Sequence, residues 1–232
     1  MTKPNLLLVP GLLCTDALFA PQIEALSDKA TIAIADHTHH DNISDMAAAM
    51  LNDAPPRFAL AGLSMGGYIA FELIRQAPER IERLALLDTN ARADRPQQAA
   101  DRREFVALAE TQGLHAVSKA FVPLMIHPDR LGDAPLVATI EQMVRDTGFE
   151  IFERQQEAII SRPDNRPFLP EIRCPTLVIV GEQDVVTPPK VSHEMAAAIP
   201  DARIEVIPDC GHLTTLERPE TVTTLLAEWL DL

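Results

Sequence analysis

The chain has few aromatic residues and few basic ones. Aromatics make up 4% of its 232 residues, with one tryptophan and one tyrosine, so its core must be built mainly from Leu, Ile, Val and Ala. Twenty Lys and Arg face 34 Asp and Glu, which gives a net charge of −14. Because phosphate binding needs a basic face, this charge argues against a nucleic-acid partner and against an anionic membrane surface.

Cysteines and long apolar runs are also scarce. Cys14, Cys174 and Cys210 are an odd number without metal-type spacing, which favours reduced thiols in a reducing compartment. No run approaches the roughly 20 apolar residues that span a bilayer. Residues 1–5 lead straight into a short apolar strand and not into a signal-peptide core. We therefore expect a cytoplasmic protein.

Short apolar runs alternate with helical patterns along most of the chain. This alternation predicts a parallel sheet covered by helices on both faces, an α/β fold. The strands are expected at Leu6–Val9, Thr31–Ala35, Phe58–Ala61, Ile81–Leu87, Thr176–Val180 and Arg203–Ile207.

The alternation breaks between residues 92 and 168. This stretch has no convincing strand and offers four helical segments, over 97–111, 113–125, 134–147 and 149–161. The sequence therefore predicts an α/β core formed by residues 1–91 and 169–232, with residues 92–168 inserted between the fourth and fifth strands as a helical cap.

Ser64 is the most informative residue, because it lies in Gly62-Leu63-Ser64-Met65-Gly66 between a predicted strand and a predicted helix. A Gly-x-Ser-x-Gly turn in that context forces a sharp backbone and holds the serine hydroxyl in a cleft. A glycine-rich turn without catalytic meaning is the alternative. The strand–helix context favours a nucleophile.

A serine nucleophile needs a base, most often histidine oriented by a carboxylate. Asp184 and His212 each fall just past the carboxyl end of a predicted strand, at the sheet edge where Ser64 falls. Three such residues at three strand ends are far more specific than any one of them. Asp88 ends the fourth strand and is the alternative acid.

With these residues the sequence resembles the α/β-hydrolase family over nearly its whole length, because Ser64, Asp184 and His212 follow that family's order of nucleophile, acid and histidine. The resemblance implies a doubly wound, mainly parallel six-stranded sheet of order 2-1-3-4-5-6 with an inserted helical cap. It also implies that Ser64 attacks, His212 serves as general base and acid, and Asp184 orients His212. No cofactor is implied.

The implied strand order brings the loop Pro10-Gly11-Leu12 beside Ser64. The backbone N–H groups of Leu12 and Met65 are the expected oxyanion hole. Most family members carry His-Gly where this chain has Pro10-Gly11, so the loop lacks the support that a histidine would give.

Side chains of the cap and of the loops around the triad are candidates for a substrate pocket. Cap residues at helical spacing could equally hold the cap on the core. The candidates are Leu13, Phe121, Leu124, Met125, Met143, Phe152, Val186 and Leu213.

Two charged clusters have alternative explanations. Arg92, Arg95, Arg102 and Arg103 could bind a substrate carboxylate, although a solvated helix face is the favoured interpretation. The Asp-His-Thr-His-His-Asp segment over 36–41 matches no dependable zinc spacing, so we expect a polar loop and no metal site.

The sequence thus predicts a serine hydrolase that cleaves a small carboxylic ester through an acyl-enzyme. Enol-lactone hydrolysis, carbon–carbon bond hydrolysis of a carboxylate-bearing substrate and acyl transfer use the same triad and stay open. The alternative from another class is a ligand receptor on the same fold. The expected partner is a small acyl compound, and the chain is either a monomer or a homodimer.

Overall fold

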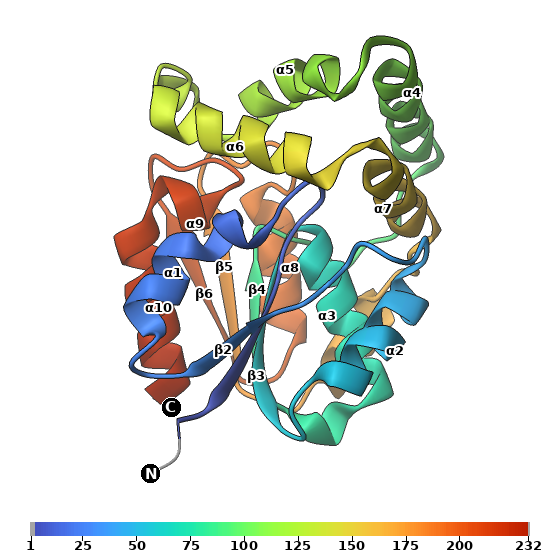
Figure 1. The fold of residues 1–232 in the computed structure, drawn as a ribbon. Coiled ribbons are helices and arrows are strands. Elements are labelled where there is room, and N and C mark those ends of the chain that lie inside the picture. Colours follow the sequence, from blue (N-terminus) through green and yellow to red (C-terminus); the bar gives the residue numbers. More distant parts are fainter. Residues whose placement is uncertain (1–2, 232) are drawn as a thin grey trace.

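The computed structural model describes residues 3–231, and its centre is a six-stranded, all-parallel sheet (Figure 1). The strand order β2-β1-β3-β4-β5-β6 confirms the order expected from the family resemblance. The strands are β1 (Asn5–Val9), β2 (Thr31–Ile34), β3 (Phe58–Leu63), β4 (Ile81–Leu87), β5 (Thr176–Gly181) and β6 (Ala202–Ile207).

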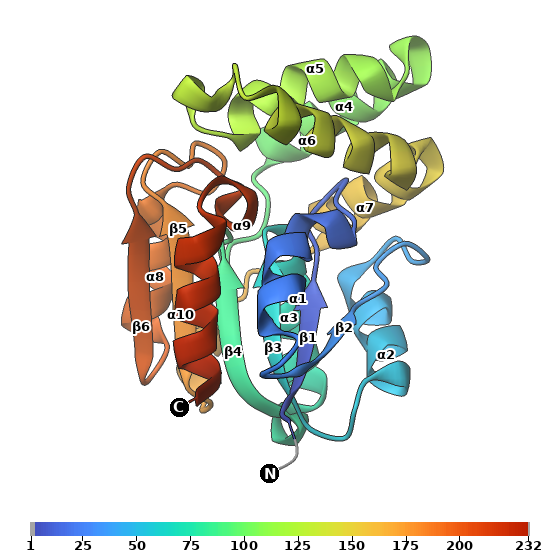
Figure 2. The same ribbon diagram turned by 60° about the vertical axis from the view of Figure 1, so that its left-hand side comes forward.

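Helices cover both faces of this sheet (Figure 2). One face carries α1 (Ala20–Leu26) and α10 (Pro219–Asp231), and the other carries α2 (Ile43–Asp53), α3 (Met65–Gln76) and α8 (Pro189–Ala198). Each face of the sheet forms a hydrophobic core with its helices, and successive residues of a strand point to opposite faces. Leu6 and Leu8 pack toward α1 and α10, whereas Leu7 and Val9 pack toward α2 and α3. Burial on both faces explains why the inner strands β1, β3 and β5 are almost wholly apolar.

Four helices are inserted between β4 and β5 and lie over the carboxyl ends of the strands (Figures 1 and 2). They are α4 (Pro96–Gln112), α5 (Leu114–Met125), α6 (Ala134–Thr147) and α7 (Phe149–Ser161). Apolar side chains from these helices pack together in a separate hydrophobic cluster. Leu13, from the loop after β1, packs into this cluster. The division into units at residues 92 and 168 stays a prediction.

The remaining helical segments are short. The helix α9 (Thr214–Glu217) follows β6. The segments of 3-10 helix are η1 (Asp16–Phe19), η2 (Pro78–Arg80), η3 (Pro128–Arg130) and η4 (Arg166–Glu171). Within residues 3–231 we find no helix whose length and apolar character would let it cross a bilayer.

Gly66 determines how closely α3 approaches β1. A Cβ at this position would lie 2.0 Å from the carbonyl oxygen of Val9 and 2.9 Å from that of Pro10. Both neighbours are backbone atoms of a buried strand end, so they cannot rotate away. The strand–helix crossing that presents Ser64 therefore requires glycine here.

We predict that Gly66→Ala destabilises the fold by at least about 1–3 kcal/mol, because the added methyl group must push two buried backbones apart. Urea unfolding measures the change. Gly132→Ala is the matched control, since a Cβ at Gly132 would meet nothing within 4 Å. Equal unfolding midpoints for the two variants would contradict this account of the crossing.

Candidate active site

Ser64 lies in a strained turn between β3 and α3. Its φ of 55° and ψ of −115° are rare for a residue with a side chain. The turn is held by the Ser64 N–H, which donates to the Leu87 carbonyl at 2.9 Å, and by Thr89 Oγ1, which donates to the Ser64 carbonyl at 2.7 Å. These bonds fix the backbone, so the hydroxyl has a defined position at the sheet edge.

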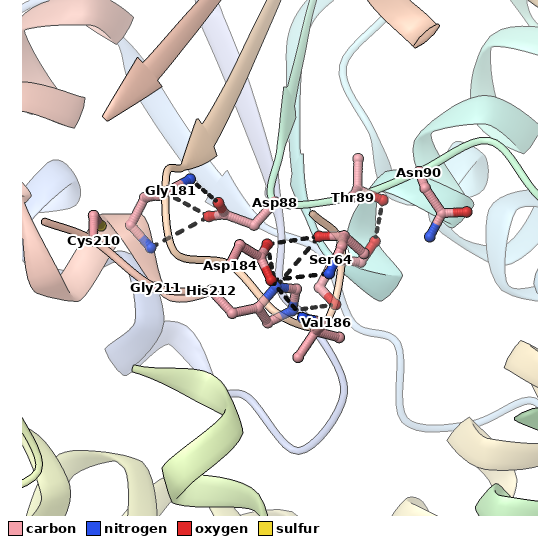
Figure 3. Close-up of polar contacts among 12 residues, drawn as sticks. Ser64, Asp88, Thr89, Asn90, Gly181, Asp184, Val186, Cys210, Gly211 and His212 are labelled. Atoms are coloured by element: carbon pink, nitrogen blue, oxygen red, sulfur yellow. Dashed lines mark hydrogen bonds and ion pairs between the residues drawn. The ribbon is translucent and has the colours of Figure 1, made fainter. Parts of the chain in front are cut away.

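Ser64, His212 and Asp184 form one line of hydrogen bonds (Figure 3). His212 Nε2 lies 2.9 Å from Ser64 Oγ, and His212 Nδ1 lies 2.8 Å from Asp184 Oδ2. Asp184 and His212 are 3% and 2% exposed. Because a carboxylate only accepts, Nδ1 carries the hydrogen and Nε2 is free to take the proton of Ser64.

The Asp184 carboxylate is fixed by donors on its own loop. Its Oδ1 accepts from the N–H groups of Val186 at 2.8 Å and Thr187 at 2.9 Å, and its Oδ2 accepts from Thr187 Oγ1 at 2.7 Å. The anion is therefore satisfied although it is buried, and it holds His212 in a single orientation.

Burial and pairing act in opposite directions on this pair. Burial disfavours the ionised form of Asp184, but the adjacent His212 and the two donors of Thr187 together outweigh it and lower the pKa of the carboxyl. Burial likewise disfavours imidazolium, but the Asp184 carboxylate, together with Asp88 and Glu217, outweighs it and raises the pKa of His212. The pair thus favours a charged imidazolium, which is the state that forms when His212 takes a proton from Ser64.

Asp88, the alternative acid, contacts other groups. It is fully buried at the end of β4 with φ of 44°, and its Oδ1 accepts from the Gly181 N–H at 3.1 Å. Its Oδ2 accepts from Thr214 Oγ1 at 2.6 Å and from the Thr214 N–H at 3.3 Å. Burial and the neighbouring Asp184 raise the pKa of Asp88 well above its ordinary value. Asp88 thus ties the loop before Asp184 to the segment after His212.

Glu217 joins the histidine loop to the cap, and nothing in the sequence singled it out. Its carboxylate accepts from the Gly211 N–H at 2.8 Å and from the His127 N–H at 2.7 Å. In the same region the His212 N–H donates to the Met125 carbonyl at 3.0 Å. The end of α5 is therefore bonded directly to the loop that carries His212.

The loop with the predicted oxyanion donor runs beside the turn at Ser64. A Cβ at Gly11 would lie 3.3 Å from the Cβ of Ser64, so the two segments are in contact. Met65 begins α3, and its N–H therefore has no acceptor within the helix. The roles of Leu12 and Met65 as oxyanion donors stay predictions.

Two side chains support this loop in place of the histidine that it lacks. The Leu13 N–H donates to Gln155 Oε1 on α7 at 3.0 Å, which fixes Leu13 in its left-handed conformation of φ 58°. His37 Nε2 lies 3.0 Å from the Gly11 carbonyl, and because a carbonyl only accepts, the ring must donate. His37, from the histidine-rich segment over 36–41, therefore holds the backbone of the loop at Gly11.

A cavity of about 200 Å³ opens beside Ser64 and His212. Five of the predicted pocket residues line it: Phe121, Leu124, Met125, Val186 and Leu213. Other lining residues carry no signal in the sequence, because they are spaced along helices and strands like ordinary core or surface residues. Among these are Leu63, Tyr68, Gln98, Asp101, Phe105, Gln156 and Ile159.

Three other residues predicted for the pocket, Leu13, Met143 and Phe152, do not line this cavity. Leu13 and Met143 border a separate space of about 20 Å³ under the cap. Phe152 is wholly buried in the cap's own core, with its ring edge-on to that of Phe121 at 6.4 Å. Their apolar character serves the packing of the cap, the alternative that the sequence left open.

Cys14 and His39 take no part in the hydrogen bonds that join Ser64, His212 and Asp184. Burial raises the pKa of the Cys14 thiol to about 12, so it is protonated although it lines the cavity. His39 makes an exposed contact with Asp36 at 3.0 Å. Across residues 3–231, no three His, Cys, Asp or Glu side chains gather in a way that would hold a metal ion.

The match to a known family agrees with this geometry. Residues 7–225 match the alpha/beta hydrolase family. The chain belongs to this family. The match includes β1 to β6 and all three of Ser64, Asp184 and His212.

Among individual proteins, the hydrolase is similar to a thermophilic esterase from Thermogutta terrifontis, solved with malate bound. The two share 31% identity and a TM-score of 0.90, over 99% of this chain and 90% of that one. An enol-lactonase from Burkholderia xenovorans shares 29% identity and a TM-score of 0.90, over 100% and 93%. A Mycobacterium tuberculosis protein provisionally named a non-heme bromoperoxidase is 33% identical, over 81% of this chain and 73% of its own.

Replacing each buried aspartate tests which one orients His212. We predict that Asp184→Asn slows labelling of Ser64 by a fluorophosphonate about 10³- to 10⁴-fold, because an amide favours the wrong histidine tautomer. Asp88→Asn should change the labelling rate less than tenfold. It should lower the free energy of unfolding by about 1–3 kcal/mol, since the amide NH₂ faces an N–H donor. The reverse order of labelling rates would make Asp88 the acid.

The pH dependence of the same labelling reaction reports the charge of His212. Only neutral His212 can accept the proton of Ser64, and its pKa is raised above the ordinary 6.5. The labelling rate should therefore rise with pH and reach half its plateau above pH 6.5. A midpoint at or below 6.5 would show that burial outweighs Asp184 and the other acidic groups around His212.

Proposed function

We propose that the protein hydrolyses a small carboxylic ester through an acyl-enzyme intermediate. The observation that carries this proposal is the continuous set of hydrogen bonds from Ser64 through His212 to Asp184, at the wall of a mainly apolar cavity. The similarity to an esterase over 99% of the chain supports it.

In the first half of the reaction, Ser64 Oγ attacks the ester carbonyl while His212 Nε2 takes its proton. The Asp184 carboxylate stabilises the imidazolium that results. The negative charge on the carbonyl oxygen is stabilised by the N–H groups of Leu12 and Met65, the second at the positive end of α3. His212 then gives its proton to the leaving alcohol, and the acyl group stays on Ser64.

In the second half, water replaces the alcohol. His212 takes a proton from this water, whose oxygen attacks the acyl carbon while the same two N–H groups stabilise the oxyanion. When the tetrahedral intermediate collapses, His212 returns the proton to Ser64 Oγ, and the carboxylic acid leaves. One water is consumed, and the triad ends in its starting state.

The size of the cavity limits the substrate. Pockets for drug-sized ligands have volumes of roughly 300–1,000 Å³, and the cavity here has about 200 Å³. Its apolar walls suit a short acyl chain, packed against Phe105, Phe121 and Ile159. We infer that small acyl groups are preferred over long ones.

A lactone is a second candidate, favoured by the similarity to the enol-lactonase at a TM-score of 0.90. A lactone is a cyclic ester, so the same steps open it, and the leaving oxygen stays attached to the acyl group. Carbon–carbon hydrolysis, acyl transfer and a receptor role stay alternatives. The cytoplasmic location and the choice between monomer and homodimer stay predictions.

Pre-steady-state hydrolysis of 4-nitrophenyl acetate and butyrate tests the proposal. The unaltered protein should release a burst of 4-nitrophenol as Ser64 is acylated, followed by slower turnover. Ser64→Ala should abolish the burst and lower turnover by several orders of magnitude.

Ser27→Ala is the control, because it removes an exposed serine hydroxyl after α1. It should leave both phases unchanged. A burst that survives in Ser64→Ala would assign the acylation to another residue, and turnover independent of Ser64 would contradict the proposed function.

A further inference from the structure

The polar side chains that α4 and α7 contribute to the cavity wall, here called its polar end, lie beside a cluster with an excess of positive charge; they are Gln98, Asp101, Arg102 and Gln156. Asp94 is a buried carboxylate, its side chain 1% exposed, and two guanidinium groups share it. Arg102 Nε lies 2.6 Å from its Oδ2, and Arg162 Nη1 lies 2.7 Å from its Oδ1. One negative charge against two positive charges leaves the cluster with a net charge of +1.

Arg162 is buried and bonded to groups within the protein. Its side chain is 3% exposed, and it donates to the carbonyls of Arg92 at 2.9 Å and Ile159 at 2.8 Å. Its guanidinium also lies over the ring of Tyr68, 4.2 Å from the centroid. Arg162 therefore helps to hold Asp94 in place, and of the two guanidinium groups it is that of Arg102 that lines the cavity.

Arg102 is presented to the cavity from α4. Besides its bond to Asp94, its Nη1 donates to Gln156 Oε1 at 3.0 Å. Within residues 3–231 these two bonds use two of its five N–H groups. Its side chain is 21% exposed, and the residue lines the same cavity as Ser64. The guanidinium is therefore held at Nε and Nη1 while other donors stay available.

Gln156 supplies a second donor at this end of the cavity. The residue is fully buried and lines the cavity, and its Nε2 has no hydrogen-bond partner among the described residues. Because its Oε1 accepts from Arg102, its NH₂ group lies beside the guanidinium. A buried amide without an acceptor is costly, and an anion bound between the two side chains would satisfy it.

One carboxylate opposes this arrangement. Asp101 also lines the cavity, but it is exposed to solvent and accepts from Gln97 Nε2 at 2.7 Å. Water and salt screen an exposed charge far more than the partly buried charge of Arg102. The field at the polar end of the cavity is therefore positive, although the protein as a whole is strongly acidic.

We propose that Arg102 and Gln156 form a subsite for a carboxylate group carried by the ester substrate. The preferred substrate is then a monoester of a small dicarboxylic acid, or an ester or lactone whose alcohol part bears the carboxylate. This inference rests on the proposed ester hydrolysis, because it assigns the charge of the molecule that Ser64 attacks. The apolar walls contact the carbon chain between the two groups.

Paired esters of equal length test the acyl side. We expect kcat/KM for mono-4-nitrophenyl glutarate, with the uncatalysed rate subtracted, to exceed that for 4-nitrophenyl hexanoate. Arg102→Met should lower kcat/KM for the glutarate ester about 10- to 100-fold and change the hexanoate value less than threefold. Gln156→Leu should have a smaller effect in the same direction.

Two further variants separate charge recognition from folding. Arg103→Met removes an exposed guanidinium from the next position of the same helix and should leave the ratio of the two kcat/KM values unchanged. Arg102→Lys keeps the charge and should retain part of the preference for the glutarate ester. Unchanged hydrolysis of the hexanoate ester shows that each variant is folded.

A second pair of esters tests the alcohol side. Hydrolysis of carboxymethyl butyrate and of propyl butyrate, followed by acid release, places the carboxylate on the leaving group. A loss in Arg102→Met confined to the glutarate ester assigns the subsite to the acyl side, and a loss confined to carboxymethyl butyrate assigns it to the alcohol side. If neither carboxylate ester loses more than threefold, the subsite is overturned, while turnover of the neutral esters still supports the proposed function.

If no ester is hydrolysed, the proposed function fails and the subsite is tested by binding alone. Calorimetric titration with glutarate should then show binding to the unaltered protein and to Arg103→Met, and none to Arg102→Met. Absence of binding to the unaltered protein, or equal binding to all three, would overturn the subsite.

Discussion

The active site depends on one strained residue between β3 and α3. Ser64 has φ of 55° in a region that side chains disfavour, which costs about 1–3 kcal/mol. The structure offsets this cost by packing Gly66 directly against the backbone of Val9 and by bonding the Ser64 backbone to Leu87 and Thr89. The same crossing places the Ser64 hydroxyl beside His212 at the wall of the cavity.

The loops around this turn are held by buried polar groups that belong to different parts of the chain. Asp88 bonds the loops that carry Asp184 and His212, and Glu217 bonds the His212 loop to the end of α5. Gln155 reaches from α7 to the loop beside Ser64. Because a buried polar group that loses its partner is costly, these bonds keep the loops in register. They also couple the inserted helices to the triad, so the cap takes part in forming the site.

The strands and the turn at Ser64 were predictable from the sequence because their signals are local. Six apolar runs mark the strands, and Gly-x-Ser-x-Gly marks the turn at Ser64. In the sequence, only the resemblance to the family favours Asp184 over Asp88 as the acid. The structure shows that Asp184 contacts His212, whereas Asp88 contacts Gly181 and Thr214. That choice depends on the directions of two side chains, which no spacing records.

The pocket was only partly predictable, because the cap helices present apolar residues both to the cavity and to their own core. Phe121 and Phe152 touch each other and have the same character, yet only Phe121 lines the cavity. Arg102 and Arg103 are neighbours in a charged run, and only the fold shows that Arg102 shares a buried carboxylate. The packing of four helices decides these outcomes, and a linear pattern carries little of that information.

The most direct test of the account is to trap the covalent intermediate itself. Acid quenching during turnover of 4-nitrophenyl butyrate, followed by peptide mass spectrometry, should find one butyryl group on Ser64 and none on Cys14 or any other nucleophile. His212→Ala should show almost no adduct under the same conditions. A butyryl group on another residue, or hydrolysis without any adduct even when deacylation is slowed at low pH, would contradict the acyl-enzyme mechanism.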